Sequence, residues 1–137
     1  MKIQIIPKLL FVSFLFLLVD CSFPAREPVP TGLMTDLLLH PEEAVITNSA
    51  PKFSWIVNGK GSGVMQTAYQ ILVATDKKTL ENGDFDVWDS GKVYSDASIA
   101  VPYRGDSLDE NSSYWWKVRT WDQNGKASPY SVTLQIS

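Results

Sequence analysis

The fifteen Asp and Glu residues are the groups of this chain that could act as general acids and bases. Hydrolysis by paired carboxylates needs two of them facing each other across a pocket, about 5–10 Å apart. Most acidic residues here fall in segments expected to be loops and turns, where they are ordinary solvated or turn-forming residues. These include Glu42, Glu43, Asp84, Asp86, Asp106, Asp109 and Glu110. Asp89 and Asp122 lie at expected strand ends, where they should cap turns, so no catalytic residue is predicted.

The other residue types that carry chemistry are too few to form a reactive site. The chain has one histidine, His40, and one cysteine, Cys21. A metal centre or a Ser-His-Asp set would need more ligands or partners in one neighbourhood. Gly59, Gly61 and Gly63 are not followed by a helical pattern, so they indicate a flexible loop and not a phosphate-binding turn. No metal ligand and no cofactor-binding residue is predicted.

The N-terminal segment is typical of an export signal. Lys2 and Lys8 form a short positive region, and it is followed by an apolar run over 9–19 that only Ser13 interrupts. The run is too short to span a bilayer, and it fits the apolar region of a signal peptide. A buried core helix is the alternative, but no amphipathic period follows the run. We therefore expect residues 1–20 to be a signal peptide.

Cys21 follows this apolar run directly and has no possible disulfide partner in the chain. Its position resembles the lipobox of bacterial lipoproteins, whose cysteine becomes the lipidated N-terminus. Asp20 departs from that pattern, because the residue before the cysteine is usually small, and ordinary signal cleavage stays open as the alternative. The sequence thus predicts export, with lipidation at Cys21 as the anchor to a membrane in the periplasm or at the outer cell surface.

The rest of the chain has the composition of one globular domain. Hydrophobic residues make up 45% and aromatic residues 12% of the sequence, and the net charge is −3. No block of Lys or Arg is present, which argues against a nucleic-acid partner. Residues 21–30 contain Pro24, Pro28 and Pro30 and are expected to form an extended tether. Residues 31–137 remain for the folded domain.

Segments of strand-like pattern alternate with turn signals throughout the expected domain. They are 33–39, 53–57, 66–75, 87–94, 98–102, 114–121 and 131–136. Only 77–82 could form a helical turn. Short strands without a long helical period predict an all-β fold, a seven-stranded antiparallel β-sandwich of the length of an immunoglobulin or fibronectin type III domain.

The strongest strand pattern, 114–121, divides its side chains between two faces. One face is expected to lie in the core, together with residues of two earlier strands. The residues predicted to be buried are Phe53, Trp55, Tyr69, Ile71, Val73, Tyr114, Trp116 and Val118. Leu108 and a short polar loop precede Tyr114, which predicts a tyrosine corner whose hydroxyl satisfies a backbone group upstream. A tyrosine that merely begins the strand is the alternative.

The opposite face of this strand carries Trp115, Lys117, Arg119 and Trp121. Alternating aromatic and cationic side chains can form a ladder of cation–π contacts, each of which contributes about 0.5–1 kcal/mol when exposed. The same residues could form a surface that contacts another domain. As an alternative, they could form a platform on which sugar rings stack. We expect a structural ladder or a domain contact.

Five segments occur in an order that resembles a known family. They are Pro51–Trp55, Gln66–Ala74, Trp88–Val93, Tyr114–Gly125 and Ser128–Ser131. This looks like the fibronectin type III-like (immunoglobulin-like) domain that opens many bacterial α-L-rhamnosidases. The resemblance covers residues 31–136, and Tyr130 stands where family members often have Trp.

The resemblance implies a non-catalytic N-terminal spacer domain, because the acid and base of those glycoside hydrolases lie in a separate helical barrel further along the chain. It implies the downstream domains of a parent enzyme as partners, and rhamnose-containing polysaccharide as a further candidate partner. The alternative is a free-standing cell-surface protein that binds carbohydrate or protein through its outer aromatic residues.

Overall fold

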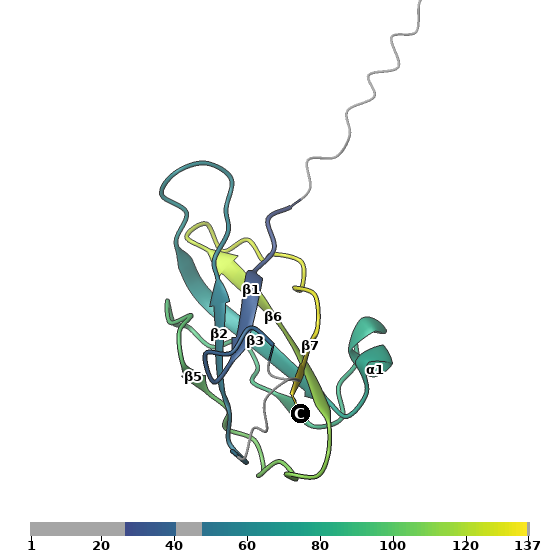
Figure 1. Ribbon diagram of the computed structural model, residues 1–137. Helices are drawn as coiled ribbons and strands as arrows, with labels where there is room; N and C mark the ends of the chain where they lie inside the picture. The colour runs from purple at the N-terminus through teal and green to yellow at the C-terminus, as the bar shows by residue number, and fades with distance from the viewer. Residues whose placement is uncertain (1–26, 41–47, 137) are drawn as a thin grey trace, which may run out of the picture.

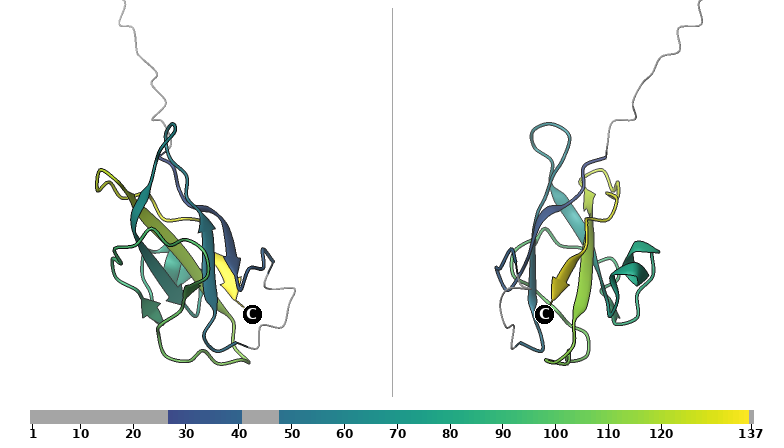
Figure 2. Two further views of the ribbon diagram at one scale, coloured as in Figure 1. Left: turned by 90° about the vertical axis from the view of Figure 1, so that its left-hand side faces the viewer. Right: turned by 45° about the vertical axis from the view of Figure 1, so that its right-hand side comes forward.

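The computed structural model describes residues 27–40 and 48–136. This part of the chain contains β1 (Thr31–Thr35), β2 (Lys52–Ile56), β3 (Gln66–Ala74), α1 (Lys77–Glu81), β4 (Trp88–Asp89), β5 (Val101–Pro102), β6 (Tyr114–Asp122) and β7 (Leu134–Ile136). The strands form two antiparallel sheets, ordered β1-β2-β5 and β4-β3-β6-β7. The sheets lie face to face, and α1 lies outside the larger one (Figures 1 and 2). The predicted sandwich is confirmed.

The central pair of the larger sheet is formed by the two long strands, β3 and β6. Both are rich in β-branched and aromatic residues, which suit a pleated and half-buried surface. Their register places Ile71 opposite Val118 and Val73 opposite Trp116. Because side chains alternate between the faces of a strand, this register sends all four side chains into the core.

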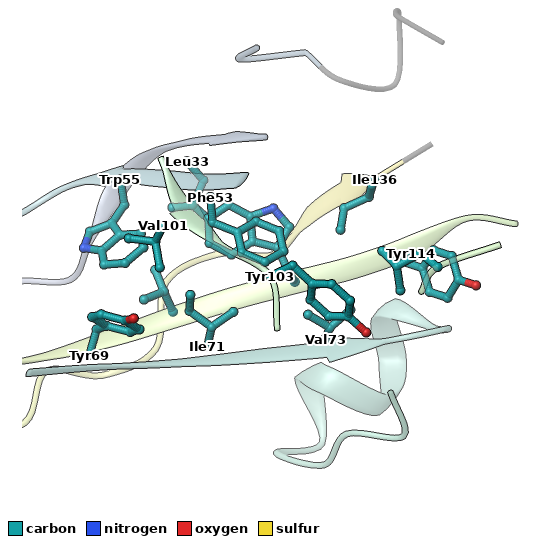
Figure 3. Close-up of a cluster of buried hydrophobic side chains, with 13 residues drawn as sticks. Leu33, Phe53, Trp55, Tyr69, Ile71, Val73, Val101, Tyr103, Tyr114 and Ile136 are labelled. Atoms are coloured by element: carbon teal, nitrogen blue, oxygen red, sulfur yellow. The ribbon is translucent and has the colours of Figure 1, made fainter. Parts of the chain in front are cut away.

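The core fills the space between the sheets, and all eight residues predicted to be buried lie in it (Figure 3). Phe53 of the smaller sheet packs on Trp116 of the larger one with ring centroids 4.4 Å apart. Trp55 contacts Tyr69 edge to face at 5.3 Å. Each buried indole also has an acceptor for its N–H: Trp55 Nε1 donates to Gln66 Oε1, and Trp116 Nε1 donates to Thr35 Oγ1.

The tyrosine corner is confirmed as well. Tyr114 is buried, and its hydroxyl accepts a hydrogen bond from the backbone N–H of Asp109 at 2.9 Å. The predicted helical turn forms α1, which begins after Asp76, whose side chain accepts from the N–H of Lys78. Asp89 and Asp122 also cap turns, because Asp89 Oδ1 accepts from Gly91 N and Asp122 Oδ1 accepts from Asn124 N.

Several strands are shorter than the sequence predicts. The predicted 33–39 strand ends at Thr35, because Asp36 and Leu37 adopt positive φ angles and turn the chain. The predicted 87–94 strand is regular only over Trp88–Asp89; Gly91, at φ +63°, interrupts it before Val93 pairs with Tyr69. The predicted 98–102 strand is reduced to Val101–Pro102 after Ala100, which has φ +51°.

The last predicted strand, 131–136, is regular only over Leu134–Ile136. Upstream of it, the chain contacts β6 through side chains as well as backbone. The hydroxyl of Ser131 accepts from Val118 N at 3.1 Å, and that of Ser128 accepts from Thr120 N at 3.0 Å. Pro129 cannot donate a backbone hydrogen bond, so a regular ladder does not form here.

The described end of the predicted tether, residues 27–30, packs against the domain. Pro30 is buried, and Asn58 Nδ2 donates to the carbonyl of Val29 at 2.8 Å. Glu27 forms ion pairs with Lys60 and Lys126 at 3.3 and 2.9 Å. The N-terminal approach to the sandwich is therefore fixed on the β2–β3 and β6–β7 loops.

Candidate functional site

The outer face of the larger sheet carries a continuous stack of aromatic and cationic side chains, here called the outer ladder. It consists of Tyr94, Lys92, Trp121, Arg119, Tyr130 and Lys117, in that order. Neighbouring members lie 4.4–4.9 Å apart, measured from the cationic group to the ring centroid. These distances are those of cation–π contacts.

Three segments of the chain position the outer ladder. Lys117, Arg119 and Trp121 share the outer face of β6, because they alternate with buried residues along one strand. The Ser128 and Ser131 hydroxyls hold the segment that carries Tyr130 against β6. Lys92 and Tyr94 follow β4, where backbone bonds between Val93 and Tyr69 hold the chain on β3.

A hydrogen-bond chain fixes the guanidinium of Arg119 in the centre of the outer ladder. Arg119 Nε and Nη2 both donate to Gln70 Oε1, at 2.9 and 2.7 Å. Gln70 Nε2 in turn donates to Asp89 Oδ1 at 2.8 Å. The stack is thus a preorganised feature of the sheet. A lysine could not replace Arg119 here, because it lacks the planar guanidinium that donates both hydrogen bonds to Gln70.

Lys117 ends the outer ladder beneath α1 and is only 7% exposed. Its Nζ donates to the carbonyl of Leu80 in α1 and lies 4.4 Å from the Tyr130 ring centroid. Burial lowers the pKa of Lys117, and the positive charge of Arg119 lowers it further. The side chain therefore ties α1 to the sheet.

Of the four residues singled out in the sequence, Trp115 stands apart. Its indole packs on a small cluster formed by Leu72, Ala74 and Leu80, beside α1. The cation that faces it is Lys77 of that helix, at 5.7 Å from the ring centroid. The structure joins Lys117 to Arg119 through the Tyr130 ring and Arg119 directly to Trp121. It places Trp115 in the contact between helix and sheet.

Sequence reasoning did not identify Lys92, Tyr94 or Gln70 as parts of the face. The alternation within 114–121 reveals only the residues of β6. The neighbours come from β3 and from the chain after Gly91, and they become visible only when the strand order is known. The order Lys92-Val93-Tyr94, with Val93 packed against the core, is the one local signal.

A pocket of about 240 Å³ lies beside Trp121, between residue 27 and the β2–β3 and β6–β7 loops. Its two carboxylates both have structural roles. Asp122 Oδ1 accepts from the N–H groups of Asn124 and Lys126, and Glu27 pairs with two lysines. The hydrogen bonds from Lys126 and Lys60 lower the pKa of Glu27, whereas a catalytic general acid needs a raised one.

The residues that the structure describes contain no group of three or more His, Cys, Asp or Glu side chains that could hold a metal ion. Among the same residues, no helix is long and apolar enough to cross a membrane. Cys21 and the predicted signal peptide lie outside the described residues.

A family model described as "Rha78A-like, N-terminal immunoglobulin domain" matches residues 38–137. An α-L-rhamnosidase from Formosa agariphila is 39% identical over 128 residues, which cover 90% of this chain and 13% of that protein. A second, from Streptomyces avermitilis, is 46% identical over 82 residues, or 60% of this chain and 8% of that protein.

The solved structure of Streptomyces avermitilis α-L-rhamnosidase complexed with L-rhamnose superposes with a TM-score of 0.73 at 36% identity. The match covers 80% of this chain and 10% of that chain. The sequence and the fold are thus similar to a small part of much longer enzymes.

Proposed function

The chain belongs to the family of Rha78A-like N-terminal immunoglobulin domains, and from this premise we propose that it is the non-catalytic N-terminal module of an exported α-L-rhamnosidase. One observation carries the proposal. The chain matches relatives that are all α-L-rhamnosidases, but it spans only 13% of the Formosa relative's length. The activity of the whole protein would therefore reside in the rest of its chain, and this module would hold that part in position.

The geometry of the sandwich suits a spacer. Ile136 is the strand-pairing partner of Tyr114, the first residue of β6. Glu27, in contrast, forms an ion pair with Lys126, just beyond the last residue of β6. A nine-residue strand separates these two points, which corresponds to about 25–30 Å at the usual rise of a β-strand. The chain therefore enters near one end of the sandwich and leaves near the other (Figure 1).

A domain exchange tests this role. Residues 22–137 would replace the region that they match in the Streptomyces avermitilis α-L-rhamnosidase. We expect a soluble enzyme that retains activity on an aryl α-L-rhamnoside, because the chemistry lies elsewhere. The matched control inserts an unrelated β-sandwich of similar length. Equal aggregation or equal loss of activity with both inserts would contradict a specific fit of this module.

We further propose that residues 1–20 direct export, that 21–30 link the anchor to the module, and that the module comprises 31–137. The support is the apolar run over 9–19 and the position of Cys21 directly after it. A lipid on Cys21 would hold the protein on a membrane in the periplasm or at the outer cell surface.

Expression in a Gram-negative host tests the anchor. We expect the wild-type chain to partition with membranes, and the Cys21→Ser variant to be released or to stall during processing. Mass spectrometry of the mature N-terminus gives the direct readout. A soluble wild-type protein that begins after Cys21 without a lipid would show that ordinary signal cleavage takes place.

A further inference from the structure

We propose that the turn at residues 36–39 docks the module onto the downstream part of the same α-L-rhamnosidase, with Leu37 as its central contact. The inference rests on the proposed function, since it names the surface through which the module would meet the rest of the enzyme. It is carried by the backbone conformation of the turn, by its exposed leucines and by its place in the fold.

The turn is a tight two-residue connection. The N–H of Thr35 donates to the carbonyl of Leu38, and the N–H of Leu38 donates back to Thr35, at 3.1 and 2.9 Å. Asp36 fixes the turn to β2, because its N–H donates to the carbonyl of Lys52 while its Oδ1 accepts from Lys52 N. The backbone at the tip is therefore anchored to the smaller sheet.

Both residues at the tip adopt the left-handed region, with φ +49° at Asp36 and +65° at Leu37. Asp tolerates this region well, but a large side chain such as Leu rarely occupies it, and turns of this kind usually have Gly or Asn there. The turn itself gains nothing from a leucine at this position. Backbone strain of this kind clusters at functional sites, so it favours a contact made by the Leu37 side chain.

The tip also exposes an apolar surface. Leu37, Leu38 and Leu39 are 62%, 40% and 58% exposed. Single exposed leucines are ordinary, but three consecutive ones on an anchored turn concentrate exposed apolar surface at one place, which favours a protein contact. A neutral polysaccharide would find no hydrogen-bonding side chain on the three leucines, so a protein partner fits this surface better.

The place of the turn selects the downstream enzyme as that partner. Thr35 at the base of the turn accepts from Trp116 Nε1, and Trp116 pairs with Leu134 of β7. The turn and β7 lie in the same half of the sandwich (Figure 2), whereas Glu27 pairs with Lys126 beyond the far end of β6. In an enzyme of the length of the relatives, the chain that follows β7 would continue from the half of the sandwich that carries the three leucines.

Thiol labelling tests the contact directly. Residues 22–137 contain no cysteine, so Leu37→Cys and Val132→Cys each introduce one reactive site. Val132 is the matched control, because it is 76% exposed and lines the outer surface beside α1 and Tyr130. Each variant is labelled with a maleimide, first alone and then joined to the downstream part of the Streptomyces avermitilis α-L-rhamnosidase.

We expect joining to slow the labelling of Leu37→Cys by about tenfold or more and to leave Val132→Cys unchanged, because a covered thiol reacts only after local opening. Equal labelling of Leu37→Cys in both proteins would overturn the proposal. So would protection of Val132→Cys instead, which would move the contact to the outer ladder. Concentration-dependent protection of Leu37→Cys in the separate module would identify a second copy as the occupant and would also overturn it.

A second variant separates docking from folding. Leu37→Asn suits the left-handed backbone, so it should leave the melting temperature of the separate module unchanged or raise it. In the joined enzyme it should lower the melting temperature of the module. A change of the melting temperature in the same direction in both proteins would overturn the docking role. Failure of the proposed function would appear differently, as a joined protein that is inactive or aggregated with Leu37 intact.

Discussion

Two buried tyrosines differ in one interaction, and they illustrate how single residues hold this fold. Tyr114 and Tyr103 are 9% and 5% exposed. The Tyr114 hydroxyl accepts from Asp109 N, whereas the Tyr103 hydroxyl has no hydrogen-bond partner among the described residues. A Cβ added at Gly105 would lie 2.3 Å from the Tyr103 oxygen, so only glycine allows this approach.

Replacing each tyrosine by phenylalanine should therefore have opposite consequences. Tyr114→Phe removes the acceptor of the partly buried hydrogen bond from Asp109 N and should lower the free energy of unfolding by about 1 kcal/mol. Tyr103→Phe removes an unpaired hydroxyl and should be neutral or stabilising. Urea unfolding followed by tryptophan fluorescence measures both. Equal losses from the two variants would contradict the assigned tyrosine corner.

The same Tyr103 makes the fold sensitive to alkali. Burial raises the pKa of its phenol above the ordinary 10.0, and Asp106 raises it further. The folded state thus holds this proton more tightly than the unfolded state. The stability linked to it is fully present below pH 10 and is lost as the pH rises through the raised pKa. Tyr103→Phe should reduce the loss of stability above pH 10, and unfolding curves at pH 8 to 11 would show this; an unchanged alkaline loss would contradict it.

The sequence predicts the burial of Tyr114 but not that of Tyr103. Leu108, a polar loop and Tyr114 form a local pattern with a known geometry. Tyr103 follows β5, a strand of two residues that has too few positions for a period. Its burial depends on Phe53 and Trp88, which approach it from two other segments.

At the scale of elements, side chains substitute for strand pairing along one edge of β6. The Ser131 hydroxyl accepts from Val118 N in a buried site, and the Ser128 hydroxyl accepts from Thr120 N in a partly buried one. Side-chain acceptors of this kind cannot be predicted from alternation alone. They explain why the predicted 131–136 strand is regular over only its last three residues.

Ser131→Ala should therefore destabilise the domain more than Ser128→Ala. The first variant leaves a buried N–H of β6 without its acceptor, at a cost of about 1–3 kcal/mol, whereas the second N–H is more accessible to water. Chemical unfolding gives the free energies, and amide exchange at Val118 and Thr120 locates the effect. A larger loss from Ser128→Ala would contradict this ranking.

The outer ladder should support the sheet and should not bind sugar. Two cations already lie within 5 Å of the Trp121 ring centroid, so they compete with any stacking sugar for the ring. We expect titration calorimetry with rhamnose-containing polysaccharide to show weak or no binding. The double variant Trp115→Ala, Trp121→Ala is the control. Saturable binding that this variant loses would favour the binding-module alternative.

At the scale of the whole molecule, the sequence predicts the sandwich and its family because both depend on patterns within single segments. The eight core residues follow from alternation and are all buried. The strained turn at Leu37, the burial of Lys117 and the contacts of residues 27–30 depend on how separate segments meet. Sequence patterns do not contain that information.

The most direct test of the central claim is a turnover measurement on purified residues 22–137 with an aryl α-L-rhamnoside, beside the Streptomyces avermitilis α-L-rhamnosidase as positive control. A non-catalytic module predicts product release no faster than in buffer, because its pocket carboxylates are held by structural hydrogen bonds and ion pairs. Turnover that copurifies with the module, scales with its concentration and is lost on unfolding would contradict the account.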